Sequence, residues 1–315
     1  MKIDTPNADT AFGIVAAVIG SEPVAIHRFT TGAAHYVFEA VFKDRAPVVV
    51  RLAADGDPSD MAGAARLSRL LRPLGVPLPE IIAEGVDHEF PYLILERLAG
   101  VDLGNVVNNL SNPALQAIAT KVAAAQAIVS KLPSAGRYGY AVTAAEAPHS
   151  RWIQVVNHHL ARSRKGIEAA GLFDAGVVDT LTVLVAAEHA ELDSIPATLF
   201  LHDTTTRNVI VSTDGTFSGI VDVDDLCFGD PRYVVALTLA ALMASGSPVD
   251  YADAWMSVAG HKDDYIFRLY VAVFVVDLMA EHGHNKLSSV EDRRRLLDVF
   301  AECLERLEFL GRGRR

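Results

Sequence analysis

The sequence is poor in cysteine and has no long apolar run. Its two cysteines, Cys227 and Cys303, do not have the spacing of metal ligands. We find neither a signal peptide nor an apolar segment long enough to span a bilayer. We therefore expect a soluble protein of the reducing cytoplasm that has no membrane partner.

Positive charge is also scarce, with 28 lysines and arginines against 39 acidic residues and a formal net charge of −11. This balance argues against a nucleic-acid partner and leaves room for a cationic one. Acidity alone decides little, since many cytosolic proteins carry a similar excess for solubility. The 315 residues, of which 50% are apolar, show no internal repeat or low-complexity linker and suffice for two lobes with a sizeable core.

Residues 201–233 hold the densest group of candidate catalytic side chains. Apolar runs at 209–211 and 219–223 flank a turn-forming segment at 212–215, and this pattern predicts a hairpin. Any single Asp or Asn beside such strands is typical of a turn or a helix cap. The combination of several such residues carries the argument.

The hairpin would place Asn208 at the entrance of its first strand and Asp222 at the end of its second. Their side-chain oxygens can converge there on a magnesium ion. Asp203 lies on the loop leading in, close enough to take a proton from a hydroxyl that attacks a metal-bound phosphate. The arrangement indicates phosphoryl transfer.

These residues resemble the aminoglycoside phosphotransferase and choline kinase family, whose patterns are HGDxxxxN followed by IDWE or IDFE. The resemblance implies a catalytic role for Asp203, metal binding by Asn208 and Asp222, and a following acid at Asp224. It also covers the GDP landmark at residues 229–231, where Asp230 would cap a helix that begins at Pro231.

The chain departs from the family pattern on this loop. The family's histidine two residues before the catalytic Asp is Leu201 here, with His202 in the adjacent position. Its usual His-Pro-Gly before the Asn is replaced by residues 205–207. Arg207 is expected to contact phosphate or substrate, or to brace the loop.

The first hundred residues have the pattern of a small sheet with one main helix. A short helix is predicted at 11–19, and strands at 36–42 and 48–52 flank a polar turn, as in an antiparallel hairpin. Gly32 lies in a small-residue loop that resembles the family's phosphate-covering loop, although an ordinary surface turn would look the same.

Arg51 ends the second of these strands, where the family carries a cation that grips the nucleotide phosphates. Taken alone, it would be read as a strand-end charge facing solvent. Helical spacing follows from 61 to 74, and in the family this helix supplies a Glu that pairs with the strand cation. The expected position falls on Gly63 or Ala64, so the ion pair is in doubt, with Asp60 as the nearest substitute.

Apolar runs at 80–83 and 92–95 predict two further strands of the sheet. Residues 95–103 resemble the hinge between the lobes. The resemblance implies that the backbone carbonyl of Glu96 and the amide of Leu98 receive the adenine edge, while Asp102 reaches the ribose. We therefore divide the chain into a nucleotide-binding lobe, residues 1–97, and a catalytic and acceptor-binding lobe, residues 98–315.

Beyond residue 112 the chain is predicted to be mainly helical. Seven segments have helical spacing: 113–132, 149–170, 177–192, 233–245, 251–258, 263–281 and 289–310. The expected fold is therefore α+β and bilobal like the protein kinases. Asp277 lies on an apolar helical face, where an unpaired acid is costly. A buried hydrogen-bond anchor explains it more readily than a substrate-binding residue, and both roles stay open.

The expected function is an ATP-dependent kinase that uses Mg²⁺ and phosphorylates a hydroxyl of a small molecule. Its alternatives are a regulatory, nucleotide-binding pseudokinase and a metal-dependent hydrolase built on Asp203, Asp222 and Asp224. The acidic excess favours an aminoglycoside or another cationic alcohol as the acceptor. Four acids in the acceptor half, Asp224, Asp225, Asp277 and Glu281, have no obvious cation to meet within the chain, so they are expected on the substrate side. A neutral sugar or a macrolide-like alcohol is the alternative.

Overall fold

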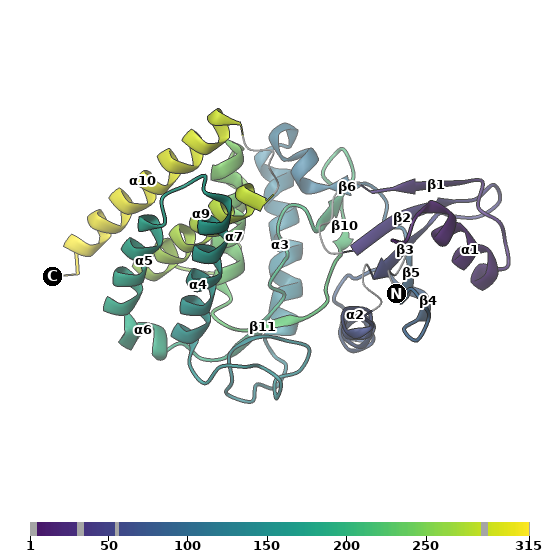
Figure 1. Cartoon of the computed structure of the whole chain (residues 1–315), viewed down its shortest axis with the longest axis horizontal. Coiled ribbons are helices and arrows are strands. Elements are labelled where there is room, and N and C mark those ends of the chain that lie inside the picture. Colours follow the sequence, from purple (N-terminus) through teal and green to yellow (C-terminus); the bar gives the residue numbers. More distant parts are fainter. Residues whose placement is uncertain (1–4, 30–34, 54–56, 285–288, 315) are drawn as a thin grey trace.

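The structure is a computed structural model that describes residues 5–29, 35–53, 57–284 and 289–314. It has two lobes, shown in Figure 1, one built on a five-stranded sheet and the other formed mainly by helices. This arrangement confirms the expected α+β, bilobal architecture. The chain crosses between the lobes near residues 97–100, and the division after residue 97 stays a prediction.

The sheet of the smaller lobe is antiparallel. Its strands are β1 (Ala25–Arg28), β2 (His35–Val41), β3 (Val48–Ala53), β4 (Ile81–Gly85) and β5 (Tyr92–Glu96). They lie in the order β1-β2-β3-β5-β4. Strands β2 and β3 pair with Phe38 opposite Val50, so the predicted hairpin is confirmed.

The two faces of this sheet carry different helices, because successive side chains of a strand point to opposite sides. Helix α1 (Ala8–Ile19) packs on the face that contains Phe38. Helix α2 (Ser59–Leu71) packs on the other face, where Met61 contacts the cluster around Leu93. The sheet therefore lies between two helices.

The larger lobe contains the remaining long helices. They are α3 (Asn112–Val129), α4 (Trp152–Ala170), α5 (Gly176–Ala187), α6 (His189–Asp193), α7 (Arg232–Ser245), α8 (Asp250–Val258), α9 (Tyr265–His284) and α10 (Val290–Arg312). All seven predicted helical segments are found, although the segment 177–192 is divided. The backbone leaves helical geometry at Glu188, between α5 and α6.

Helix α9 forms the centre of this lobe. It packs against α4, α7 and α10, and its apolar side chains are buried almost throughout. In Figure 1 it lies among these helices, with α10 on the outside of the lobe. Asp230 accepts a hydrogen bond of 3.0 Å from the backbone N–H of Arg232, as predicted, but α7 begins at Arg232 and the N-cap position is Pro231 rather than Asp230.

Two small sheets complete the larger lobe. One consists of β6 (Val101–Asp102), β9 (Val209–Val211) and β10 (Phe217–Ile220). The other consists of β7 (Gly139–Ala141), β8 (Thr198–Phe200) and β11 (Leu226–Gly229). Strands β9 and β10 pair antiparallel, which confirms the hairpin predicted in residues 209–223.

Helix α2 also contacts the larger lobe. Leu67 and Leu71 on α2 belong to a buried cluster that contains Leu201, at the start of the loop between β8 and β9, and Ile220 of β10. The same helix therefore packs on the sheet with one side and on the segments around the site with another. No helix among the described residues combines the length and apolarity needed to cross a membrane.

Candidate active site

The loop between β8 and β9, residues 201–208, is held by a buried glutamine. Gln126 of α3 is 8% exposed, and its Oε1 accepts a hydrogen bond of 2.9 Å from the Leu201 amide. Its Nε2 donates to the Leu201 carbonyl and to Oγ1 of Thr204, at 2.9 and 2.8 Å. The sequence analysis missed this residue, although an amide on an apolar helical face was a usable signal, because buried polar groups need partners.

Asp203 lies on this loop with few hydrogen-bond donors. Oγ1 of Thr205 is 3.4 Å from its Oδ1, a long contact, while Asn208 Nδ2 donates to its backbone carbonyl at 2.8 Å. Burial raises the pKa of the Asp203 carboxyl, and the negative charge of Asp222 adds to this, whereas His202 opposes it. A carboxylate that is poorly compensated in this way is a suitable proton acceptor.

Asp222 lies two residues beyond the end of β10, because that strand spans Phe217–Ile220 and not 219–223 as predicted. Val221 still donates to the carbonyl of Asn208 at 2.9 Å, so the two predicted ligand residues lie on neighbouring segments. Asp222 is the one non-glycine residue with positive φ, 63°, among those described. Strained backbone of this kind concentrates at functional sites.

The donor set around this point suits a hard cation. Asp222 offers a carboxylate whose side chain is 47% exposed, and Asn208, whose Nδ2 is engaged by the Asp203 carbonyl, has its amide oxygen left to accept or ligate. Carboxylate and amide oxygens are the ligands that Mg²⁺ takes in proteins. The residues present therefore fit the predicted magnesium site.

Arg51 on β3 connects the two lobes at the site. Its Nη1 donates to Asp224 Oδ1 at 2.5 Å, and its Nη2 makes a second, short bond to Oδ2 of the same carboxylate. Nη2 also lies 3.0 Å from Oδ1 of Asp222 and 3.0 Å from Nδ1 of His35. Arg51 is only 4% exposed, so the prediction of an inward-facing cation is supported over a strand-end charge facing solvent.

The glutamate that the family carries on α2 has no room at Gly63, because the backbone of Asp224 in the larger lobe packs against that position. A Cβ added at Gly63 would lie 2.8 Å from the carbonyl oxygen of Asp224, closer than real Cβ atoms approach. Asp60, the predicted substitute, does not contact Arg51: its Oδ2 is 3.4 Å from Nε2 of His35. The ion-pair partner of Arg51 is therefore on the other lobe, which the sequence analysis did not foresee.

His35, Asp222 and Asp224 place ligand atoms within 4.8 Å of one another, as a metal site requires. Nη2 of Arg51 reaches all three of these side chains, so a positive charge already lies among them. Burial and the neighbouring Arg51 lower the pKa of His35. We assign this group to Arg51 rather than to a second metal ion.

The predicted adenine and ribose residues lie at the end of β5, in the connection between the lobes and at the start of the larger lobe. The Glu96 amide donates to the Glu80 carbonyl at 2.8 Å, and Arg97 donates to the carbonyls of Leu98 and Gly100. Both carboxylate oxygens of Asp102 accept from Asn105, at 3.1 and 2.9 Å, so this side chain caps a short 3₁₀ helix. Adenine binding at Glu96 and Leu98 and ribose binding at Asp102 stay predictions.

Gly32, predicted in the phosphate-covering loop, lies outside the described residues. In the connection between the lobes, Gly100 has a φ of 115°. A Cβ there would lie 2.1 Å from the carbonyl oxygen of Val211, so only glycine allows β6 to approach β9.

Asp224 and Asp225 of the acceptor half have cationic partners within the protein. Nε2 of His202 makes a short contact with Asp225. Burial would lower the pKa of His202, but Asp225, Asp203 and Asp224 outweigh it and raise that pKa. Together with the Arg51 pair of Asp224, this corrects the expectation that these acids meet no cation.

Asp277 is a buried anchor. Its carboxylate, 8% exposed, accepts from Ser163 at 2.9 Å and from Arg162 at 3.1 Å, and lies 3.0 Å from Nε2 of His159. Burial alone would raise its pKa, but His159, Arg162 and Ser163 outweigh burial and lower it to about 2. The network supports the structural interpretation over substrate binding.

Arg207 and Glu281 are two exposed charged residues of this region. No hydrogen bond or ion pair of Arg207 with another described residue is found. The pKa of Glu281 is raised, mainly because the surrounding protein displaces water and then because of Asp277, while Arg207 opposes the rise. The charges of Arg207 and Asp203 both act on Glu281. Substrate contact by Arg207 stays a prediction.

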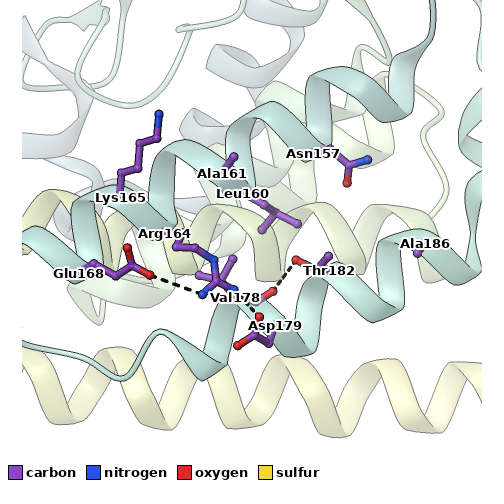
Figure 2. Close-up of a pocket in the computed structure, with 10 residues that line it drawn as sticks. All are labelled: Asn157, Leu160, Ala161, Arg164, Lys165, Glu168, Val178, Asp179, Thr182 and Ala186. Atoms are coloured by element: carbon purple, nitrogen blue, oxygen red, sulfur yellow. Dashed lines mark hydrogen bonds and ion pairs between the residues drawn. The ribbon is translucent and has the colours of Figure 1, made fainter.

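A separate cavity of about 550 Å³ lies between α4 and α5 (Figure 2). Three of its four charged lining residues are already paired, since Arg164 makes a short bond to Asp179 and lies 3.6 Å from Glu168. It shares no lining residue with the catalytic loop. We assign it no part in the chemistry.

Comparison with known proteins agrees with this geometry. The sequence matches the APH family, the phosphotransferase enzyme family, over residues 25–265. A comparison with curated protein sequences gave no match.

Solved structures of aminoglycoside phosphotransferases share the fold. An apo thermostable mutant of APH(4)-Ia is 15% identical, with a TM-score of 0.67, 92% of this chain covered and 98% of that one. A complex of APH(4)-Ia with AMP-PNP and hygromycin B is 16% identical, with a TM-score of 0.65 and coverage of 94% and 99%. An aminoglycoside phosphotransferase with GDP and kanamycin is 17% identical, with a TM-score of 0.65 and coverage of 96% and 98%. The kinase-like, bilobal fold is therefore confirmed.

Proposed function

The chain belongs to the phosphotransferase enzyme family, APH, and we propose that it transfers the γ-phosphate of ATP to a hydroxyl group of a small molecule. One observation carries the proposal. Asp203, Asn208 and Asp222 lie on two adjoining segments at one end of the β9–β10 hairpin, and the buried cation Arg51 reaches the same point from the other lobe. Base, ligand oxygens and cation are the parts that phosphoryl transfer needs.

The proposed reaction uses Asp203 as the base. The acceptor oxygen attacks the γ-phosphorus, the bond from that phosphorus to the β–γ bridging oxygen breaks, and ADP leaves with the bonding electrons. The hydroxyl proton passes to a carboxylate oxygen of Asp203. Its raised pKa supports this role, because a carboxylate that is costly to keep ionised takes a proton more readily.

The other residues would bind and neutralise the phosphates. A magnesium ion bound by Asn208 and Asp222 would supply charge neutralisation at the phosphate oxygens. Arg51 adds a fixed positive charge on the smaller lobe, and its burial leaves it little freedom to turn away. Gln126 keeps the Asp203 loop in place through Leu201 and Thr204.

The structure gives the pseudokinase alternative less support than the sequence did. That alternative depended on the missing carboxylate on α2 and on the weak glycine loop. Arg51 has a carboxylate partner in Asp224, so the cation is not left unpaired. The hydrolase alternative differs in that ATP turnover would need no acceptor.

The acceptor is proposed as a small-molecule hydroxyl compound. The structural neighbours include complexes with kanamycin and hygromycin B, which motivates testing aminoglycosides first. Asp224, Asp225 and Asp277 are paired with cations of the protein itself. These acids therefore give no reason to prefer a cationic acceptor. Neutral alcohols are therefore tested on equal terms with cationic acceptors.

The test is a labelled-phosphate screen. Protein, Mg²⁺ and γ-labelled ATP are incubated with aminoglycosides, amino alcohols, neutral sugars and macrolides at low and high salt, and labelled products are separated. Transfer to an acceptor supports the proposal. A phosphate release that no acceptor changes identifies a hydrolase, and ATP binding without turnover identifies a pseudokinase. Capture of a cationic acceptor should weaken as salt screens exposed charges over about 10 Å at 0.1 M.

A further inference from the structure

Arg51, the cation of the smaller lobe, pairs with a carboxylate of the larger lobe and not with one on α2. On α2, the position facing the site is Gly63, and the backbone of Asp224 packs directly against it. An acidic side chain at that position would collide with the Asp224 carbonyl, 2.8 Å from an added Cβ. The partner of Arg51 must therefore come from elsewhere.

The Asp224 contact is the strongest that Arg51 makes. Both terminal nitrogens of the guanidinium donate to the two oxygens of this carboxylate, Nη1 to Oδ1 and Nη2 to Oδ2. Bidentate pairing holds a guanidinium in one orientation, which a single contact does not do. The contact with Asp222 is single, 3.0 Å from Nη2 to Oδ1.

Because Arg51 is buried, its guanidinium depends on protein partners and not on water. Arg51 is 4% exposed, and its Nε has no hydrogen-bond partner among the described residues. A buried guanidinium that lost Asp224 would keep only the Asp222 oxygen and the ring nitrogen of His35. Removing one partner of a buried charge pair is costly because the other charge stays behind in a dry environment.

We propose that Asp224 is the positioning residue for Arg51, supplying from the larger lobe the carboxylate that α2 lacks. This inference rests on the proposed function, in which Arg51 binds the nucleotide phosphates. Asp224 acts through Arg51 and touches no reacting atom. Because the two residues belong to different lobes, the pair forms only when the lobes lie together, so phosphate binding and the approach of the lobes are coupled.

The two acids therefore differ in role. Asp222 holds Arg51 by one contact and can exchange that contact for its proposed metal ligation. Asp224 holds it by two and keeps the guanidinium in place while the Nη2 hydrogen that faces Asp222 becomes available to a phosphate. Asp224 was expected to be a substrate residue, and this geometry assigns it to the nucleotide side instead.

The test is a double-mutant cycle on nucleotide binding. The dissociation constant of AMP-PNP with Mg²⁺ is measured by titration calorimetry, without acceptor, for the parent, Arg51→Met, Asp224→Asn and the double variant. Asp224→Asn should weaken binding about 10-fold or more and should have no further effect once Arg51 is replaced. Where transfer is measurable, KM for ATP should rise while KM for the acceptor stays within about 2-fold.

The matched control is Asp225→Asn, an adjacent acid paired with His202 and not with Arg51. Its effect on binding should add to that of Arg51→Met. Melting curves check that each variant is folded. If Asp224→Asn does not fold, Asp224→Glu replaces it: nucleotide binding well above that of Arg51→Met supports the inference, and binding as weak as Arg51→Met contradicts it.

Additive effects of Arg51→Met and Asp224→Asn, in a parent protein that binds nucleotide, would overturn the inference and leave the proposed function standing. A parent protein that binds no nucleotide would overturn the proposed function. In that case the same cycle measured on melting temperature still decides whether the pair couples the lobes: a non-additive result supports the coupling and an additive one overturns it.

Discussion

Asp203 and Asp277 are two aspartates of the same lobe whose surroundings have opposite effects. Asp277 is enclosed by Ser163, Arg162 and His159, and its pKa falls to about 2 although burial alone would raise it. His202, Asn208 and Thr205 compensate the charge of Asp203 only in part, and its pKa rises through burial. Burial acts in the same direction on both carboxylates. Their pKa values shift in opposite directions because nearby donors and cations compensate the negative charge of Asp277 and not fully that of Asp203.

This difference separates structural acids from the proposed catalytic acid in this protein. An acid whose charge is matched on all sides contributes to stability and has no free lone pair directed at a substrate. An acid that is enclosed but poorly matched makes the folded state less stable and is available for proton transfer. The same distinction separates Asp222, which is half exposed and singly bonded, from Asp277.

The largest expected effect comes from Asp222→Asn. Removing the charge of a proposed magnesium ligand should reduce Mg²⁺-dependent ATP turnover to background, because the phosphates lose their neutralising cation. The melting temperature should change little, since the side chain is 47% exposed and has one contact with Arg51. Turnover and melting are measured together.

Asp214→Asn is the matched control for this variant. Asp214 lies in the turn between β9 and β10, where its carboxylate accepts from Ser212 and Thr216 outside the site. The Asp214→Asn substitution removes one negative charge from the same hairpin as Asp222→Asn does. It should keep ATP turnover within about 2-fold of the parent. Parental turnover in folded Asp222→Asn would exclude the metal assignment.

Asp203→Asn should lower turnover about 10²- to 10⁴-fold, the range for loss of a general base, with little change in nucleotide affinity. The unfolding free energy at neutral pH should stay the same or increase, because ionised Asp203 is disfavoured by its surroundings. Denaturant titration and AMP-PNP binding provide these two readouts. Lost nucleotide binding with unchanged turnover per bound nucleotide would show that Asp203 holds the nucleotide instead.

Asp277→Asn should act on stability alone. It leaves Arg162 and His159 without their carboxylate, and we expect about 3 kcal/mol less unfolding free energy, the lower end for breaking a buried pair. Denaturant titration gives the loss, and AMP-PNP affinity of the folded variant should match the parent. If the variant had parental stability and an altered KM for the acceptor, Asp277 would be a substrate-binding residue and not a structural one.

The smallest expected effect is the acid dependence of stability. The pKa of Asp277 is about 2 in the folded protein, below its usual 3.8, so its contribution is present above about pH 4 and is lost as pH falls toward 2. That contribution is about 2 kcal/mol. The stability difference between the parent and Asp277→Asn should therefore shrink over this range, and a constant difference would contradict the assignment.

The sequence predicted most of the local structure because periodicity is a local property. The hairpin at residues 209–223 and the seven helical segments of the larger lobe were placed within a few residues. The end of β10 was misplaced because its apolar run continues to Val223, while the backbone turns at Asp222 with φ of 63°. A backbone turn of that kind leaves no mark on hydrophobic patterning.

Tertiary structure decided how the charges are matched. The sequence showed that α2 lacks an acid where the family carries one, and it placed Asp60 nearest. Only packing brings Asp224 to Arg51, 173 positions away along the chain, and seats its carbonyl against Gly63. The same holds for the pairing of Asp277 with Arg162 and His159, which lie on different helices from it.

By itself, the sequence determined the order of the elements, the lobe composition and the identity of the candidate base and ligands, because spacing along one chain carries that information. The structure decided which acids are left free for chemistry and which are neutralised. Coulomb interactions depend on distances in space and on the water that packing removes, and neither is encoded in the separation of residues along the chain. Asp203 and Asp277 differ for that reason.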